Sequence, residues 1–304
     1  MASVGSLEET ALPAVRSALL EWFAENQRSF PWRESEDPYE ILVSEVMSQQ
    51  TQLDRIVEPW RTFVERWPSP AALASADRAA VISFWTDHRL GYNNRARYLH
   101  EASERIVEEF GGELPADPAA LRTLPGVGPY TSTAVAAFAF EIPGAVVDTN
   151  VKRVLYRAFD VPDDRAAFES AAEGLLRRNA VADWNNAIME LGALVCGRTP
   201  ACEAAACPWK RWCQAYRTGD FTAPDVPSQP AFDGSRRQKR GRVLRALSEH
   251  GTLSIDALGV RVRVDFEPGE EGDREWLEAL LADLETDGLV TVTEGSPRTV
   301  SLAD

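Results

Sequence analysis

The chain has little lysine and cysteine, and it has no long apolar run. Only three of its 32 basic residues are lysines, which leaves 29 arginines against 47 acidic residues and a net charge of −15. No apolar stretch reaches the roughly 20 residues that span a bilayer, and Met1–Thr10 lacks the basic region and apolar core of a secretory signal. We therefore expect a soluble, cytoplasmic protein that binds no membrane, and the acid-rich, lysine-poor composition suggests a high-salt cytoplasm.

The excess of acid argues against a nucleic-acid partner when it is taken over the whole chain, because phosphate binding normally needs a basic surface. That objection concerns the global charge, and a local basic patch can answer it. A length of 304 residues with 44% hydrophobic residues indicates a globular chain of two domains.

The pattern along the chain divides it into three parts. Residues 8–217 place apolar side chains three and four positions apart, which predicts helices. Residues 218–235 are rich in proline, glycine, serine and aspartate and are typical of a linker. Residues 236–304 read as helices followed by two alternating runs joined by Gly295-Ser296-Pro297, a hairpin signal. We expect a mainly α fold with a small, winged-helix-like α+β domain at the C-terminus.

All four cysteines lie within 18 residues, in the spacing Cys196-x5-Cys202-x4-Cys207-x5-Cys213. Disulfides are rare in cytoplasmic proteins, so four thiols in one short loop indicate a metal centre. Zinc sites usually hold their ligands as two C-x2-C pairs, which this chain lacks, whereas an iron–sulfur cluster accepts wider, uneven spacing. The spacing favours a 4Fe-4S cluster, with zinc as the alternative.

The sequence LPGVGPYT lies between two stretches of helical pattern, Pro118–Thr123 and Thr131–Phe140. Gly126 and Gly128 allow a partner to approach the backbone closely. Pro129 begins the second helix, whose first N–H groups form a site for an anion. Such a hairpin can hold a DNA phosphate without a charged side chain, although GVG alone is also typical of an ordinary turn.

Two carboxylates are candidates for acid–base chemistry, and Glu45 is the first. It lies in a helical run that begins near Tyr39 and includes Ser44–Gln52. Because Glu45 follows Leu42 and Ile41 by three and four positions, its carboxyl lies on an apolar face. Desolvation there raises the pKa and keeps the group protonated near neutral pH.

Asp148 is the second candidate. It ends the apolar run Ala145–Val147 and opens the helical segment DTNVKRVLYRAF, so it is also a natural N-cap. One protonated acid and one carboxylate are the pair that breaks a glycosidic bond through an oxocarbenium-like transition state. Residues 103 positions apart are not brought together by the sequence pattern alone.

Most of the first 217 residues resemble the adenine DNA glycosylases of the MutY type, in the helix-hairpin-helix (endonuclease III) superfamily. The matching segments are FPWR (Phe30–Arg33), SEVMSQQT (Ser44–Thr51), LGYNNRARYLH (Leu90–His100), LPGVGPYT (Leu124–Thr131), VDTNVKRVL (Val147–Leu155), NNAIMELGALVC (Asn185–Cys196) and the cysteine loop. The family's cluster loop is usually C-x6-C-x2-C-x5-C, so this chain departs from it in the first two gaps. The resemblance implies the two-lobed glycosylase fold with a 4Fe-4S cluster.

The resemblance also implies a role for each matching residue. Glu45 matches the acid that protonates adenine, Asp148 the carboxylate that stabilises the sugar cation, and Asn150 the amide that orients the aspartate. Tyr130 stands where bifunctional relatives carry a Schiff-base lysine, which implies base removal without amine-linked strand cleavage.

Contacts to DNA, to the base and to the metal are implied in the same way. Gln49 matches the residue that fills the vacated base stack, and Tyr92 matches the wedge beside the lesion. The expected DNA-binding residues are Gln49, Gln50, Tyr92, Gly126, Gly128 and Pro129. The expected adenine contacts are Trp32, Arg33 and Glu190. The expected cluster ligands are Cys196, Cys202, Cys207 and Cys213.

The chain is thus expected to be a monofunctional glycosylase of base excision repair, acting as a monomer on double-stranded DNA. Its substrate would be adenine mispaired with guanine or oxidised guanine. The expected domains are a cluster lobe (1–35 and 142–217), a helical lobe with the hairpin (36–141), the linker (218–235) and the winged-helix-like domain (236–304).

Departures from the family pattern concern the strand opposite the adenine. Between Thr86 and Leu90 this chain has DHR where the family usually has one glycine, and Asn93 stands where a second tyrosine is common. The family's Nudix-like C-terminal domain, which inspects oxidised guanine, is not recognisable in 236–304. The basic run from Arg236 to Arg242 offers the best remaining contacts, and we expect the rest of this domain to pack or to bind a protein partner.

Two other functions remain open. A thymine or uracil mismatch glycosylase of the same superfamily can also carry tyrosine at position 130, but excising a pyrimidine does not call for a protonating glutamate. A non-catalytic iron–sulfur protein that binds DNA is the other alternative.

Overall fold

The computed structural model describes residues 4–225 and 231–304, so residues 1–3 and residues 226–230 of the predicted linker lie outside the described residues. The described residues form two compact units. The first unit takes those within Met1–Glu45, Pro115–Thr123 and Val127–Ser228, and the second takes those within Val46–Leu114, Leu124–Gly126 and Gln229–Asp304. The domain boundaries given above stay a prediction.

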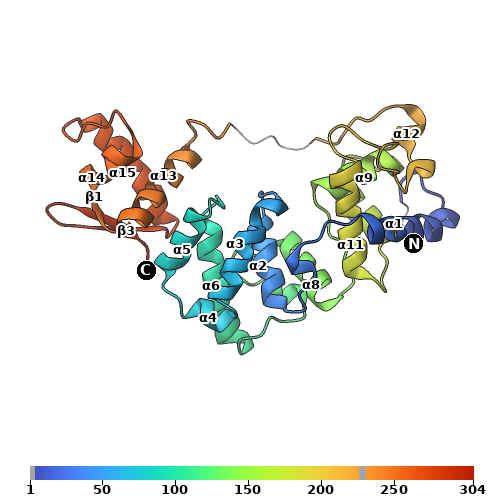
Figure 1. The fold of residues 1–304 in the computed structure, drawn as a ribbon, viewed down its shortest axis with the longest axis horizontal. Coiled ribbons are helices and arrows are strands. Elements are labelled where there is room, and N and C mark those ends of the chain that lie inside the picture. The colour runs from blue at the N-terminus through green and yellow to red at the C-terminus, as the bar shows by residue number, and fades with distance from the viewer. Residues whose placement is uncertain (1–3, 226–230) are drawn as a thin grey trace. The chain divides into compact units, whose positions relative to one another are not determined.

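The regular structure described in the first unit is helical. Helix α2 begins in this unit and ends in the second. The elements are η1 (Glu9–Ala11), α1 (Leu12–Asn26), η2 (Pro31–Arg33), α2 (Pro38–Ser48), α7 (Pro118–Leu121), α8 (Pro129–Phe140), α9 (Thr149–Phe159), α10 (Arg165–Leu175), α11 (Val181–Glu190), the π-helical turn η3 (Leu191–Val195), η4 (Lys210–Trp212) and α12 (Gln214–Thr218). Helix α11 packs against α1, α8 and α9, which places it at the centre of the unit (Figure 1).

The core of the first unit is aromatic. Trp209 packs against Phe159 and Trp184, with ring centroids 5.0 Å and 6.3 Å away. Its indole Nε1 donates to the carbonyl oxygen of Val15 in α1 at 2.9 Å. Burying a ring of this size with its N–H satisfied stabilises a fold by a few kcal/mol. Trp209 therefore anchors the cysteine-rich segment to helix α1.

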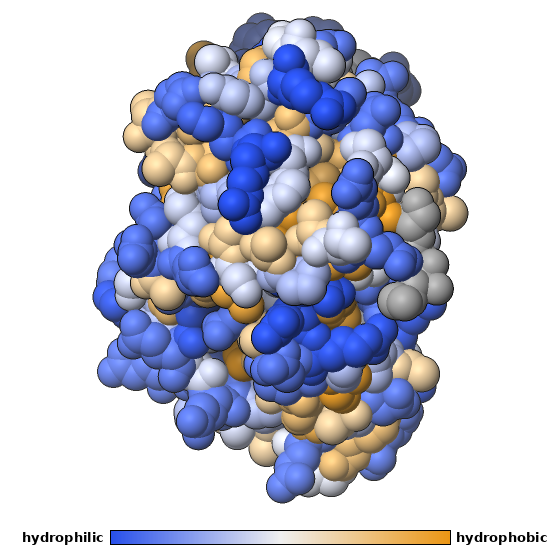
Figure 2. Space-filling view, turned by 90° about the vertical axis from the view of Figure 1, so that its right-hand side faces the viewer, coloured by the Kyte–Doolittle hydropathy of each residue, from blue (hydrophilic) through white to orange (hydrophobic). Residues whose placement is uncertain are grey.

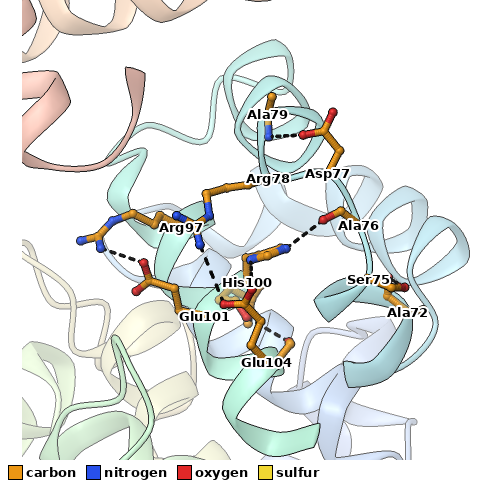
Figure 3. A network of polar contacts seen from close by, with 12 residues as sticks. Ala72, Ser75, Ala76, Asp77, Arg78, Ala79, Arg97, His100, Glu101 and Glu104 are labelled. Atoms are coloured by element: carbon orange, nitrogen blue, oxygen red, sulfur yellow. Dashed lines mark hydrogen bonds and ion pairs between the residues drawn. The ribbon is translucent and has the colours of Figure 1, made fainter. Parts of the chain in front are cut away.

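The second unit begins with four helices, α3 (Leu53–Arg66), α4 (Pro70–Ala74), α5 (Arg78–Asp87) and α6 (Asn94–Phe110). Polar contacts hold α6 to the connection between α4 and α5 (Figure 3). His100 Nε2 lies 3.0 Å from the carbonyl oxygen of Ala76, and Glu104 reaches Arg78 at 3.9 Å. Buried polar groups need such partners, so this network fixes how the helices pack.

The C-terminal part of the second unit combines three helices and a small sheet. Its elements are α13 (Arg236–His250), β1 (Leu253–Ser254), α14 (Ile255–Val262), α15 (Glu271–Thr286), β2 (Val290–Thr293) and β3 (Thr299–Leu302). The strands are antiparallel in the order β1-β3-β2, with Val290 opposite Leu302 and Leu253 opposite Val300. The predicted class, mainly α with a small α+β part at the C-terminus, is confirmed.

One sequence-based expectation about α2 is wrong. The helix ends at Ser48 and does not include Gln49–Gln52, because Gln50 has a φ of 56° in the left-handed region. Gln49 and Gln50 therefore lie on a turn.

The face drawn in Figure 2 is mostly hydrophilic, and its apolar side chains form separate small patches. Among the described helices, none combines the length and the apolar character needed to cross a bilayer.

Candidate active site

A buried amide on α11 positions the chain that leads to Asp148. Asn185 accepts the N–H of Val146 at 2.8 Å and donates to the carbonyl oxygens of Gly144 and Val181, both at 3.0 Å. The residue is 2% exposed, so these bonds are shielded from water. Asn185 thereby fixes the extended segment immediately before α9.

Asp148 is the N-cap of α9, as its sequence position predicted. Its Oδ1 accepts the N–H of Val151 at 2.7 Å, and its Oδ2 accepts the side-chain amide of Asn150 at 2.8 Å. Burial raises the pKa of Asp148, while the Val151 and Asn150 bonds and the charge of Arg153 oppose that rise. The donors around this carboxyl group stabilise its ionised form.

Glu45 lies half-buried in α2. Desolvation, followed by the negative charge of Asp148, raises the pKa of Glu45 to about 7, and the Arg33 guanidinium opposes the rise. The two carboxyls therefore lie within electrostatic range of each other. Burial raises both pKa values, but hydrogen bonds and the charge of Arg153 oppose the rise at Asp148, so Glu45 is the candidate acid and Asp148 the candidate anion for glycosidic cleavage.

Tyr130, in the first turn of α8, belongs to the same group. Its side chain is 37% exposed, yet burial around the hydroxyl and the charges of Glu45 and Asp148 raise the pKa of its phenol far above 10. The phenol is neutral and lies within electrostatic range of both carboxyl groups. Glu45, Asp148, Asn150 and Tyr130 are thus brought together in the first unit.

Two of the predicted adenine contacts, Arg33 and Glu190, form an ion-pair cluster with Arg28. Glu190 is 1% exposed and accepts from Arg28 at 2.9 Å and from Arg33 at 2.7 Å. Burial alone would raise the pKa of Glu190, but the hydrogen bonds from the two arginines lower it below its ordinary value. Trp32 is buried and stacks on Phe30 at 5.0 Å. Contact between a base and Trp32, Arg33 or Glu190 stays a prediction.

Arg153 links the carboxylate group to the cysteine segment, and sequence reasoning missed it. Its guanidinium donates to Asn150 Oδ1 at 2.7 Å, to the Gly192 carbonyl at 2.8 Å and to the Cys196 carbonyl at 2.7 Å. A Cβ on Gly192 would lie 2.6 Å from the Cβ of Asn150, so glycine is required for this close approach. The only sequence signal was its place in VDTNVKRVL.

The four cysteines are half-buried free thiols. Burial raises the pKa of Cys207 to about 12; the N–H of Trp209 opposes the rise, and the other three cysteines add to it, so the four sulfurs interact. No group of three or more His, Cys, Asp or Glu side chains among the described residues is arranged to hold a single metal ion.

The surroundings of these sulfurs fit a group bound by thiolates. The backbone N–H of Trp209 points at Cys207, and those of Tyr216 and Ala215 point at Cys213. Arg157 donates to Cys196 Sγ at 3.7 Å. N–H donors of this kind stabilise cluster thiolates.

The hairpin glycines differ in their surroundings. Gly126 has a φ of 74°, and a Cβ there would lie 2.7 Å from the Cβ of Tyr98 in the same unit, so glycine is needed. Gly128 caps α8 ahead of Pro129 in the first unit, and a Cβ there would meet open space. The start of α8 is thus accessible to an anion.

The second unit holds Gln49, Gln50 and Tyr92 on two irregular segments with a common anchor, Arg95 of α6. Gln50 and Tyr92 both have positive φ values, 56° and 46°, which few residues other than glycine adopt without support.

The Arg95 guanidinium provides this support. It donates to six acceptors, five of them backbone carbonyl oxygens: Val46, Met47, Gln49, Leu90, Gly91 and Thr51 Oγ1. The residue is 6% exposed, and burial lowers its pKa to about 10, so it stays charged. Sequence reasoning missed Arg95, although it lies within LGYNNRARYLH.

Comparison with known proteins agrees with this geometry. Residues 43–178 match the family model of the HhH-GPD superfamily base excision DNA repair protein. The adenine DNA glycosylase of Mycobacterium tuberculosis is 42% identical over 242 residues, which cover 75% of this chain and 77% of that protein. The enzyme of the same name from Mycolicibacterium smegmatis is 38% identical, over 77% of this chain and 80% of its own length.

Solved structures give the same fold. A thermostable thymine-DNA glycosylase superposes with a TM-score of 0.64 and 28% identity, covering 69% of this chain and 98% of its own. An endonuclease III trapped as a covalent DNA intermediate superposes with a TM-score of 0.60 and 21% identity, over 70% of this chain and 99% of its own. The chain belongs to the adenine DNA glycosylase family, within the HhH-GPD superfamily of base excision repair proteins.

Proposed function

We propose that the chain is a monofunctional DNA glycosylase that removes adenine mispaired with guanine or oxidised guanine from double-stranded DNA. The observation that carries the proposal is the pairing of Glu45, whose pKa lies at about 7, with the hydrogen-bonded carboxylate of Asp148. The name shared by the relatives from both mycobacteria supports adenine as the base.

In the proposed reaction Glu45 gives its proton to a ring nitrogen of the flipped adenine. The bond between the sugar carbon and the base then breaks, and its electron pair leaves with the neutral adenine. Asp148, held by Asn150 and Val151, stabilises the positive charge that develops on the sugar. Water adds to the sugar carbon and loses a proton, so the product is an abasic site.

Tyr130 limits the reaction to base removal. A phenol cannot form an imine with the sugar carbon, and burial beside two carboxyls keeps this phenol neutral. We therefore expect no amine-linked strand cleavage.

DNA binding is proposed to use main-chain features more than side-chain charge, which suits a chain of net charge −15. The accessible start of α8 would hold a phosphate. Tyr92 would wedge beside the lesion, and the turn at Gln49 and Gln50 would fill the space that the adenine leaves. Trp32, Arg33 and Glu190 would contact the base or position its neighbours.

We propose that Cys196, Cys202, Cys207 and Cys213 hold a 4Fe-4S cluster. When bound, such a cluster would crosslink the loop through four metal–sulfur bonds and hold its path rigid. Chemical analysis tests this directly. About four irons per chain and a visible absorption band that acid bleaches would support the cluster, whereas stoichiometric zinc without iron would contradict it.

The remaining proposals concern the context of the reaction. We propose that the protein acts as a monomer in a cytoplasm of high salt. Its C-terminal domain would offer the acidic face of α15 to a protein partner, because that helix repels phosphate. Assays across a range of salt concentrations are needed, since phosphate-driven affinity falls steeply with ionic strength.

A panel of duplexes tests the function. Adenine opposite oxidised guanine, adenine opposite guanine and thymine opposite guanine are incubated with the protein, and the released base is identified. We expect adenine from the first two. Release of thymine would favour the alternative that the thymine-DNA glycosylase neighbour and Tyr130 suggest.

A non-catalytic role predicts a different result. In that case Glu45→Gln and Asp148→Asn would change nothing measurable. Loss of base release with retained duplex binding in both variants would support catalysis.

A further inference from the structure

Two departures from the family pattern meet at one surface of the second unit: the insertion between Thr86 and Leu90, and the C-terminal domain that begins with α13. The insertion between Thr86 and Leu90 extends α5 to Asp87, whose carboxylate accepts the hydroxyl of Ser248 in α13 at 2.8 Å. Ser83, one turn earlier in α5, lies 2.5 Å from the same hydroxyl. Helices α5 and α13 pack against each other within this unit. The inserted residues thus position the first helix of the C-terminal domain.

A cavity of about 960 Å³ lies beside this contact. One part of its lining comes from the turn and loop assigned above to DNA, including Gln49, Gln50 and Tyr92, and the other part comes from α13. The volume exceeds that of a single nucleotide, and cavities of this size bind sizeable ligands.

The cavity carries positive charge in an acidic chain. Arg236 and Arg240 of α13 are neutralised by ion pairs with Asp283 and Asp287. Arg55, Arg89 and Arg245 also line it, and none of these three has a carboxylate partner within 4.0 Å among the residues that the structure describes. Arginines that lack a carboxylate partner in such a recess favour a phosphate-bearing ligand.

Arg237 of α13 also lines the cavity and contacts two aromatic side chains. Its Nη1 donates to the hydroxyl of Tyr92 at 2.5 Å, and its guanidinium carbon lies 5.2 Å from the centroids of both the Tyr92 and the Phe232 rings. These contacts fix the guanidinium beside the proposed wedge. A base beside the wedge could stack on an aromatic ring while the guanidinium donates to its edge.

We infer that Arg237 reads the base that stays opposite the excised adenine, and that it prefers guanine. This rests on the proposed function, because removal of adenine from a duplex leaves its partner base next to the wedge. Arginine donates in bidentate fashion to O6 and N7 of guanine, the commonest specific contact in the major groove. Oxidised guanine carries a hydrogen on N7, so it would keep only the bond to O6. Arg89 and Arg245 would bind the adjoining phosphates. Helix α13 thereby supplies a contact to the strand opposite the adenine.

The chemistry of the base edge gives a sharp test. In 7-deazaguanine the N7 acceptor is replaced by a C–H group, and the Watson–Crick edge is unchanged. Single-turnover adenine excision and duplex affinity are measured opposite guanine and opposite 7-deazaguanine. The proteins are the unaltered chain, Arg237→Ala, Arg237→Lys and the control Arg261→Ala. Arg261 lies on α14, is exposed, donates to the carbonyl of Ala257 at 2.8 Å and does not line the cavity.

We expect excision rate and duplex affinity of the unaltered protein to be about tenfold lower opposite 7-deazaguanine than opposite guanine. Opposite guanine, Arg237→Ala should reduce both by a similar factor. The two losses should not add, since each removes the same contact. Arg237→Lys keeps the charge but cannot donate two parallel hydrogen bonds as the planar guanidinium does. Its excision rate and affinity opposite guanine should therefore fall nearly as much as those of Arg237→Ala. Arg261→Ala should excise adenine at nearly the rate of the unaltered protein opposite either base.

If Arg237→Ala reduced the excision rate and the affinity by equal factors opposite guanine and opposite 7-deazaguanine, the inference would be overturned. Arg237 would then contact only a phosphate. Melting temperatures identify a variant that fails to fold, and Arg237→Lys then carries the comparison. If the unaltered protein releases no adenine from any duplex, the proposed function fails. The affinity measurements on guanine and 7-deazaguanine still decide the inference in that case.

Discussion

The side-chain amide of Asn150 donates to Oδ2 of Asp148 at 2.8 Å, while Arg153 holds the carbonyl of the same amide at 2.7 Å. Arg153 therefore fixes which end of Asn150 faces the aspartate. The N–H of Val151 satisfies the other carboxylate oxygen. Asp148 is thus both a helix cap and an oriented anion, and these two roles can be separated by mutation.

Asp148→Asn should separate them. Asparagine caps a helix about as well as aspartate, so the free energy of unfolding should change by less than about 1 kcal/mol. The charge that stabilises the sugar cation is lost, and single-turnover excision should fall by about a thousandfold or more with duplex affinity retained. Asp164→Asn, at the N-cap of α10, is the matched control and should keep full activity. A comparable loss of activity in both variants would argue against a catalytic role for Asp148.

The pKa of Glu45 predicts the pH dependence of excision. Below about pH 7 the carboxyl carries the proton that adenine needs, so above pH 7 the rate should fall about tenfold per pH unit. At low pH the rate should fall again, because the Asp148 carboxylate, whose pKa is also raised, takes up a proton. Glu45→Gln should be slow at every pH and lose the inflection near pH 7. The exposed Glu58→Gln should keep the profile of the unaltered protein. An inflection near pH 7 that survives in Glu45→Gln would assign it to another group.

The Glu45 carboxyl should also make the folded chain less stable as pH rises. Its pKa in the folded chain, about 7, lies above the ordinary value of 4.5, so the unfolded chain releases this proton first. The contribution of Glu45 to stability is complete below about pH 4.5 and is lost as pH rises through about 7, by at most about 3 kcal/mol. Relative to the unaltered protein, Glu45→Gln should therefore gain stability across this window. Urea denaturation at pH 5 and pH 8 measures the difference, and an equal difference at both pH values would contradict it.

Arg95→Met should damage fold and DNA binding together. The change leaves five carbonyl oxygens without their guanidinium donor, three in buried and two in part-buried bonds, which should cost about 3 kcal/mol or more of unfolding free energy. Arg95→Lys, with three donors, should recover part of it. Arg105→Met removes a partly exposed arginine of the same helix and should cost under about 1 kcal/mol. Equal melting temperatures for Arg95→Met and Arg105→Met would show that Arg95 is no anchor.

Tyr130→Lys should convert the reaction into one that forms a trappable intermediate. The tyrosine hydroxyl lies within electrostatic range of Glu45 and Asp148, so an amine at this position would reach the same sugar carbon. Borohydride should then trap a covalent complex between protein and DNA, visible as a shifted band on a denaturing gel. Neither the unaltered protein nor Tyr130→Phe should give this band. Trapping of the unaltered chain would contradict the expectation of base removal alone.

The structural features that the sequence predicted correctly depend on residues that are close together along the chain. The cap at Asp148, the apolar face around Glu45 and the C-terminal hairpin all follow from local spacing, and the structure has them. The positioning roles of Arg95, Arg153 and Asn185 could not be predicted from the sequence. Most of their partners are backbone groups up to 49 positions away, and backbone groups are the same whatever the residue type. The end of α2 at Ser48 was missed for a related reason. The left-handed Gln50 is supported by tertiary bonds to neighbouring carbonyls, which no local pattern reports.

The anchor formed by Arg95 also bears on how such a protein can diversify. Carbonyl oxygens are common to all twenty amino acids, so the guanidinium holds the two irregular segments whatever side chains they display. Position 49 is therefore open to exchange under selection for other mismatches, whereas positions 50 and 92 accept residues that tolerate a left-handed φ. Libraries randomised at position 49, and restricted at positions 50 and 92 to such residues, should retain folded members at high frequency.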